Sequence, residues 1–175
     1  MGGIEKIKKN TSVGKAGIRE GIMSLEEDIR KQEGAFIGDS DICPLKHSFT
    51  DGIYVREIFV PAGMVLVGKI HKHEHPNFLL SGEADMVTED GGRVRVKGPC
   101  AMISPSGTKR ALVSVTDLVW ITVHHNPTNT QDLKELEEII IADSYAKYDK
   151  YKKVSERKIV TLWNKIIKKL TICRG

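Results

Sequence analysis

The sequence predicts a mainly β fold: an antiparallel jelly-roll barrel with an N-terminal helical arm and C-terminal amphipathic helices. Between residues 52 and 126, short apolar segments alternate with turn residues, as in successive strands. The connections between them are too short for the helical crossovers that parallel strands require. Outside this region, apolar residues recur at helical spacing. A jelly roll suits such strands because its two-sheet arrangement protects strand edges.

The chain has the length of one globular domain with appendages, since it contains 175 residues. We expect an N-terminal arm with a short helix and a loop over residues 1–51, the barrel over residues 52–126, and a helical, basic tail over residues 127–175.

The N-terminal arm contains one predicted helix. Ile18, Ile22, Leu25 and Ile29 share one face of it, and Gly34 is a plausible stop. The residues that follow, up to about Asp51, are rich in turn formers and predict a loop.

The barrel region predicts about eight strands separated by turns. The strongest hairpin signal is the Glu89-Asp90-Gly91-Gly92 segment, because glycine accepts the positive φ angles of tight turns. The expected strands cover residues 52–60, 64–71, 78–80, 83–88, 93–96, 100–104, 108–115 and 118–125.

The C-terminal tail predicts two helices joined by a hinge. Thr128 or Asn129 can cap the first helix, whose first turn contains Asp132. A Lys-rich hinge, KYDKYKK, precedes a second amphipathic helix that begins near Ser155. Its apolar face comprises Ile159, Leu162, Trp163, Ile166 and Leu170.

The charge of the chain is concentrated in this tail. The formal net charge is +4, and ten of the 27 basic residues lie between Lys147 and Arg174, where there are only two acidic residues. Such a helix can dock on another subunit, lie on an anionic membrane or bind nucleic acid; docking is the favoured interpretation.

The sequence shows neither a membrane-spanning segment nor the apolar core of a secretory signal. We therefore expect a cytoplasmic protein of the host cell, or a virion component, that does not follow the secretory route. The three cysteines are far apart and form no CxxC pair, which disfavours a metal cluster built from them.

Histidines are the candidate metal ligands. The segment HKHEHP places His71, His73 and His75 close together, and His47 and His124 are further candidates, with His47 preferred. Such ligands suit a divalent Zn, Fe, Mn or Ni ion, which the sequence does not distinguish. The alternative is a solvated loop whose histidines point outward.

Two segments resemble the motifs of the cupin superfamily: PAGMVLVGKIHKHEHPNFLLSGEADMV and GPCAMISPSGTKRALVS. Aligned on Gly82, His75 occupies the glutamate position of the first motif and His71 the second histidine position, while Lys69 replaces the first histidine. Arg110 replaces the histidine of the second motif. The resemblance implies a cupin barrel whose usual metal site is altered.

The two cationic replacements suggest a different ligand. If Lys69 and Arg110 point into the barrel beside His71, they favour an anionic or sugar-like molecule over a metal ion. Alternatively, Arg110 pairs with Glu57, Glu83 or Asp85 and only joins strands.

The chain is also similar to small cupin-like proteins of tailed bacteriophages, through the segments PLKHSF, YVREI and GKIHKH. The leading hypothesis is a phage-encoded, homo-oligomeric protein that binds a small ligand or a metal. One alternative is a structural virion component that contacts other virion proteins through its arms. The other is an enzyme acting on a small polar or sugar-like substrate, with unknown catalytic residues.

Overall fold

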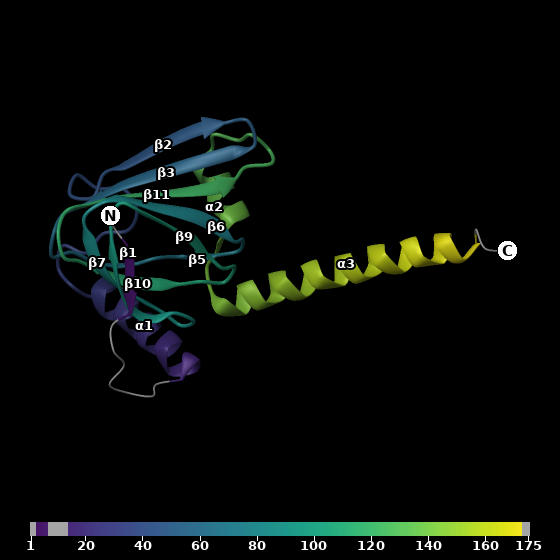
Figure 1. Ribbon diagram of the computed structural model, residues 1–175, viewed down its shortest axis with the longest axis horizontal. Coiled ribbons are helices and arrows are strands. Elements are labelled where there is room, and N and C mark those ends of the chain that lie inside the picture. The colour runs from purple at the N-terminus through teal and green to yellow at the C-terminus, as the bar shows by residue number, and fades with distance from the viewer. Residues whose placement is uncertain (1–2, 7–13, 173–175) are drawn as a thin grey trace.

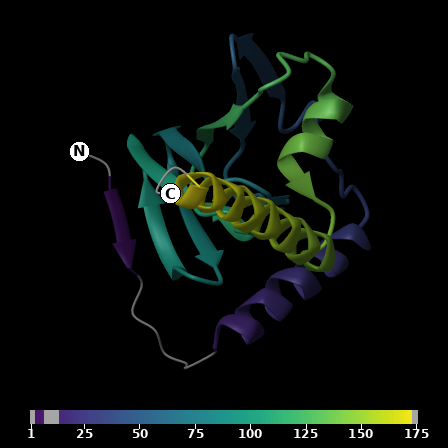
Figure 2. The same cartoon turned by 90° about the vertical axis from the view of Figure 1, so that its right-hand side faces the viewer.

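The computed structural model describes the backbone of residues 3–6 and 14–172 and the side chains of residues 14–167. A barrel of strands forms the body of the molecule, and one long helix projects from it (Figures 1 and 2).

The barrel consists of two five-stranded sheets in which every pairing is antiparallel. The first sheet has the order β1 (Gly3–Lys6), β8 (Gly92–Lys97), β7 (Glu83–Thr88), β10 (Arg110–Ser114) and β4 (Val65–Val67). The second has the order β2 (Leu45–Thr50), β3 (Ile53–Val60), β11 (Leu118–His125), β6 (His75–Ser81) and β9 (Cys100–Ser104). A short pair, β5 (Ile70–His71) with β12 (Ile141–Ala142), lies beside them. The prediction of an antiparallel jelly-roll barrel is confirmed.

The core lies between the sheets because inward and outward side chains alternate along the strands. In β11, Leu118, Trp120, Thr122 and His124 are buried, and the residues between them are more exposed. Apolar side chains from both sheets, including Leu79, Val96 and Leu118, fill the barrel at one of its two ends. His124 lies at the other end of β11, away from this apolar cluster.

Strand β2 was expected to be a loop. Its six residues pair with β3 along their whole length, and Leu45, His47 and Phe49 face inward. The turn-rich residues before it obscured this alternation in the sequence. The barrel therefore begins at Leu45 rather than at residue 52, and β1 adds a further strand from the N-terminal arm.

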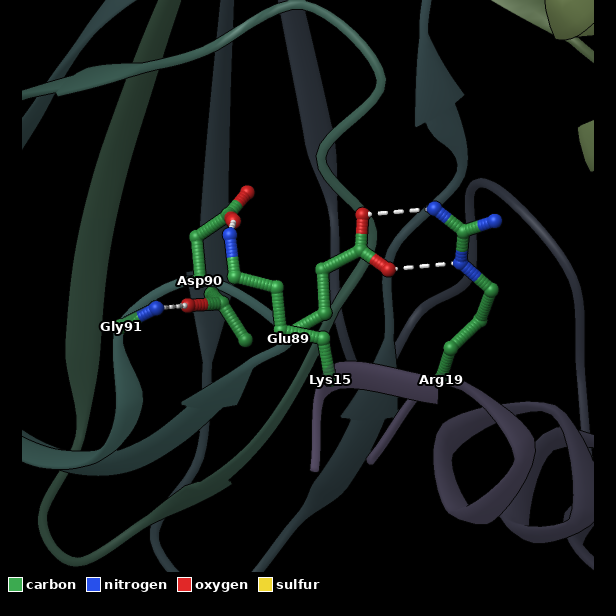
Figure 3. A network of polar contacts seen from close by, with 6 residues as sticks. Lys15, Arg19, Glu89, Asp90 and Gly91 are labelled. Atoms are coloured by element: carbon green, nitrogen blue, oxygen red, sulfur yellow. Dashed lines mark hydrogen bonds and ion pairs between the residues drawn. The ribbon is translucent and has the colours of Figure 1, made fainter. Parts of the chain in front are cut away.

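Helix α1 (Lys15–Arg30) confirms the predicted helix of the arm and lies beside the first sheet. Its buried residue is Ile22. Figure 3 shows two ion pairs that join α1 to the β7–β8 turn: Arg19 contacts Glu89 through two hydrogen bonds of 2.6 and 2.9 Å, and Lys15 contacts Asp90 at 2.5 Å.

The tail differs from the prediction at two points. Asp132, expected in the first turn of a helix, is itself the N-cap of α2 (Leu133–Ile140), where its carboxylate accepts hydrogen bonds from the Lys134 and Glu135 amides. The expected hinge does not exist, because α3 runs without a break from Tyr145 to Ile172. The KYDKYKK segment contains no glycine or proline, and lysine is a good helix former.

The first turns of α3 are anchored on the barrel by tyrosines. Tyr148 packs with Ile70 and Ala142, and its hydroxyl lies 2.8 Å from the hydroxyl of Ser106. Gly107 has a φ angle of +83°, and a Cβ atom there would meet the Tyr148 ring at 2.6 Å, so this turn requires glycine. Among the described residues, no helix is long and apolar enough to cross a membrane.

Candidate metal centre

Three histidines meet at one end of the barrel: His71 in β5, His75 at the start of β6 and His124 in β11. One ring nitrogen of each can be chosen so that all three lie within 4.8 Å of one another. The ring centroids are 4.2 Å apart for His71 and His75, 4.6 Å for His75 and His124, and 5.1 Å for His71 and His124. His75 and His124 are buried, and His71 is partly exposed.

The strand register explains this convergence. His124 lies opposite Tyr54 of β3, at a buried position in β11. His75 begins β6, which lies on the other side of β11, and faces Ser104 of β9. His71 is held by the pairing of β5 with β12, in which it lies opposite Ile141. The positions of the three rings relative to one another therefore depend on contacts between segments that are distant in the sequence.

His75 has one nitrogen bonded and one free. Its Nδ1 atom lies 3.2 Å from the carbonyl oxygen of His73 and can donate a hydrogen bond to it. Its Nε2 atom is buried and has no hydrogen-bond partner among the described residues. This bond favours the tautomer that carries the proton on Nδ1 and a lone pair on Nε2. In metal-binding histidines, a backbone carbonyl commonly fixes the tautomer in the same way. A buried nitrogen without a partner is costly unless something binds it.

All three imidazoles are held neutral. Burial lowers the pKa of His71 well below its ordinary value, and the neighbouring His75, His124, Arg110 and Arg56 lower it further. Burial, followed by the charges of His75 and Arg56, lowers the pKa of His124 to about 3. The pKa of His75 is lowered too, mainly by burial. Neutral imidazole is the form that binds metal ions.

Arg110 reaches the site from β10 of the first sheet. Its guanidinium donates hydrogen bonds to the Ser104 hydroxyl and, at 3.4 Å, to Oδ1 of Asn77. Asn77 also accepts a hydrogen bond from Trp120 Nε1 at 3.2 Å and donates one to Ser104 Oγ at 2.8 Å. Burial lowers the pKa of Arg110 to about 10. The alternative in which Arg110 pairs with Glu57, Glu83 or Asp85 is not what the structure shows, since its hydrogen-bond partners Ser104 and Asn77 are neutral.

A second arginine, Arg56, lies near the histidines. In β3 it is paired with His47 on one side and with Thr122 on the other. Its positive charge contributes to the lowered pKa values of His47, His71 and His124. In the described part of the chain, neither Arg56 nor Arg110 forms an ion pair with a carboxylate. The surroundings of the three imidazoles are therefore electropositive.

The other predicted residues lie outside the cluster. Nδ1 of His47 lies 2.7 Å from the hydroxyl of Tyr54, whose ring stacks between His47 and His124. The preference for His47 over His124 is thus corrected: Tyr54 separates His47 from the cluster, which contains His124. His73 is exposed and lies edge-on to Tyr151.

Lys69 is also placed differently from the expectation. Its ammonium group pairs with Glu137 of α2 at the surface, where about half of each side chain is exposed. It does not join Arg110 and His71 inside the barrel. The motif alignment identified the position of Lys69 in the chain, but the acidic residues of α2 direct its side chain outward.

The sequence patterns did not predict Arg56, Asn77 or Tyr54 as site residues. Arg56 belongs to the YVREI segment, and its alternation with Tyr54 places both on the inner face. Only the pairing of β3 with β11 brings them beside His124.

The donor set fits a first-row divalent ion. Three neutral imidazoles can bind Zn, Fe, Mn or Ni and leave coordination positions open for water or a ligand. The unpartnered Nε2 of His75 is the atom that such an ion would satisfy. The nearby guanidinium groups oppose a positive charge, so an anion bound together with the metal would balance the site.

Comparison with protein-family models and with curated protein sequences gave no match. Among solved structures, the chain is similar to a Cupin 2 conserved barrel domain protein from Salinispora arenicola, with 17% identity, a TM-score of 0.43, and coverage of 57% of this chain and 89% of that chain. It is similar to KdgF from Halomonas sp., with 15% identity, a TM-score of 0.43, and coverage of 51% and 86%. It is also similar to ectoine synthase from P. lautus, with 13% identity, a TM-score of 0.43, and coverage of 55% and 72%.

Similarity at this level says nothing about activity. The strand order of the chain itself defines the architecture, since two antiparallel sheets enclose the core in the manner of a jelly roll. The chain therefore has an antiparallel jelly-roll barrel with a three-histidine cluster at one end.

Proposed function

We propose that this protein binds a divalent metal ion through His71, His75 and His124 and holds a small anionic ligand beside it. The observation that carries the proposal is the buried Nε2 atom of His75, which has no partner and belongs to a cluster of three neutral imidazoles. A solvated histidine loop, the alternative for this segment, does not account for buried rings.

The anionic ligand follows from the charges around the metal. The positive charges of Arg56 and Arg110 both lower the pKa of His71. Neither arginine forms an ion pair with a described carboxylate, although Asp39 and Glu137 lie near enough to raise the pKa of Arg56. Arginine recognises carboxylate and phosphate groups through its planar, forked donors. Arg110 already bonds Ser104 and Asn77, so Arg56 is the residue we expect to contact the ligand.

The metal proposal is tested by titrating chelator-treated protein with Zn²⁺ in a calorimeter. We expect about one ion per chain, and a loss of affinity of at least about tenfold in His75→Ala, because one of three ligands is removed. His125→Ala is the matched control, since His125 adjoins His124 but is exposed. Unchanged binding in His75→Ala would overturn the proposed site.

The anion proposal has a separate readout. Binding of malonate, used as a simple dicarboxylate probe, is measured with the Zn²⁺-loaded protein and with its Arg56→Gln variant. We expect weaker malonate binding but the same Zn²⁺ content in the variant. Equal malonate affinity in both proteins would exclude Arg56 as the anion-binding residue without affecting the metal site.

Homo-oligomerisation and a phage origin are part of this proposal. The outer face of the second sheet presents four large apolar side chains that are 37–61% exposed: Phe59, Phe78, Leu80 and Ile103. We refer to them as the outer apolar patch. A second copy of the chain is the occupant we propose for it. The phage origin is proposed on the resemblance of the PLKHSF, YVREI and GKIHKH segments alone.

A further inference from the structure

Helix α3 has two parts with different surroundings. Its first turns are anchored by Tyr145, Tyr148 and Tyr151, which pack against the barrel. Beyond Ser155, every described side chain up to Ile167 is exposed. Figures 1 and 2 show the helix projecting away from the barrel. Because 28 residues extend roughly 42 Å at 1.5 Å per residue, the outer part lies well clear of the barrel.

The outer part is strongly amphipathic. Six large apolar side chains, between 41% and 65% exposed, lie within an arc of about 160° at 3.6 residues per turn. We call this the α3 apolar arc: Ile159, Val160, Leu162, Trp163, Ile166 and Ile167. So many exposed apolar side chains on one face mark an interaction surface.

The rest of the outer helix is basic. Arg157, Lys158 and Lys165 lie outside the arc and are exposed, and the sequence adds Lys168, Lys169 and Arg174. Glu156 is the one acidic residue between Lys150 and the C-terminus. The partner must therefore offer both an apolar medium and negative charge.

We propose that the outer part of α3 is a membrane-surface anchor that lies in the plane of an anionic lipid bilayer. The α3 apolar arc, with Trp163 near its centre, enters the boundary between headgroups and acyl chains, and the lysines and arginines contact lipid phosphates. This distribution is typical of interfacial helices. The proposal is independent of the metal site, which lies in the barrel.

The other partners fit less well. Two copies of α3 would bring like charges together, and the arc is broader than the narrow apolar seam of a two-stranded coiled coil. A nucleic acid would pair with the basic residues but would leave the apolar arc in water. An anionic membrane satisfies both faces at once.

The test is sedimentation of the full chain with two kinds of vesicle: phosphatidylcholine alone, and equal parts of phosphatidylcholine and phosphatidylglycerol. We expect binding to the anionic vesicles and little to the neutral ones. Trp163→Ala/Ile166→Ala should bind at least about tenfold more weakly, because two of the most apolar side chains of the arc are removed. Alanine keeps the helix propensity, and circular dichroism checks the helix content.

The matched control is Val113→Ala/Val115→Ala, which removes two apolar side chains of similar exposure from the barrel. This variant should bind the vesicles as the unmodified chain does. Emission from Trp163, the exposed tryptophan of the two in the chain, should shift to shorter wavelength with anionic vesicles. Absence of vesicle binding, or equal binding by the Trp163 variant, would overturn the proposal. So would a change of oligomeric state in that variant, or tighter binding of the chain to a single-stranded RNA than to the anionic vesicles.

Discussion

At the scale of single residues, burial determines the chemistry of the site. His124 and its neighbour His125 differ only in the face of β11 on which they lie, yet His124 is buried beside two other imidazoles and His125 is exposed. Burial lowers the pKa of His124 to about 3, so its ring stays neutral over most of the acid range. The same side chain is a candidate ligand at one position and a surface group at the next.

The lowered pKa values predict an acid-sensitive fold. In the unfolded chain these histidines take up protons below their ordinary pKa of about 6.5, whereas the folded protein resists this. The free energy of unfolding of the metal-free protein should therefore fall as the pH falls from about 6.5 towards 4, by up to about 1.4 kcal/mol per pH unit for each such histidine. Urea denaturation at several pH values measures this slope.

His124→Asn should reduce the slope. If this variant kept the slope of the unmodified chain, the neutral, buried state of His124 would be contradicted.

How far the site could be predicted differs between residues. The HKHEHP segment identified His71 and His75 because three histidines in so short a run are conspicuous. Ranking His124 against His47 required the β2–β3–β11 register, which places Tyr54 between them. Arg56 gave no signal of its own, since an arginine among strand residues is common on an outer face.

At the scale of elements, ion pairs of unequal strength join α1 to the barrel (Figure 3). Arg19 forms a two-bond contact with Glu89, whose side chain is 11% exposed, and its guanidinium also stacks 3.7 Å from the centre of the Tyr145 ring. It therefore links α1, the β7–β8 turn and the base of α3. Lys15 pairs with Asp90, and more than half of each of these two side chains is exposed.

Removal of the Arg19 side chain and removal of the Lys15 side chain should lower the free energy of unfolding by different amounts. Arg19→Ala should lower the free energy of unfolding by about 1–2 kcal/mol, because a bidentate pair and a cation–π contact are lost. Lys15→Ala should lower it much less than Arg19→Ala does, since exposed ion pairs contribute little. Urea denaturation of both variants provides the comparison. Equal losses would show that Arg19 does not join the three elements.

Elements with clear local signals were predicted well, and those that depend on distant contacts were not. The Gly91-Gly92 turn and the alternating segments beside it determine β7 and β8 locally. Strand β2 exists because β3 provides a partner, and its flanking turn residues suggested a loop. The unbroken helix α3 was not predicted, although its local signal is clear. The run of lysines was interpreted as a hinge, whereas lysine favours helix.

At the scale of the whole molecule, apolar surface is divided between two places. The outer apolar patch lies on the second sheet, and the α3 apolar arc lies on the projecting helix. The patch consists of apolar side chains on strands, which suits contact with an identical patch, whereas the arc is accompanied by basic residues. The two surfaces therefore suit different partners.

The patch predicts the oligomeric state. We expect the chain to sediment as a dimer or a larger assembly in analytical ultracentrifugation. The reason is that contact between two outer apolar patches would supply the apolar area that a stable interface buries. Phe78→Ser/Ile103→Ser should shift it to a monomer, and Val65→Ser/Val113→Ser, at similarly exposed positions of the first sheet, should not. A monomeric unmodified chain would contradict the proposed assembly.

The most direct test of the central claim is an anomalous difference map from crystals grown with Zn²⁺ and measured at the zinc absorption edge. We expect one strong peak at about 2.0–2.1 Å from a ring nitrogen of each of His71, His75 and His124. A peak bound by other residues, or no peak among these three rings at saturating Zn²⁺, would contradict it.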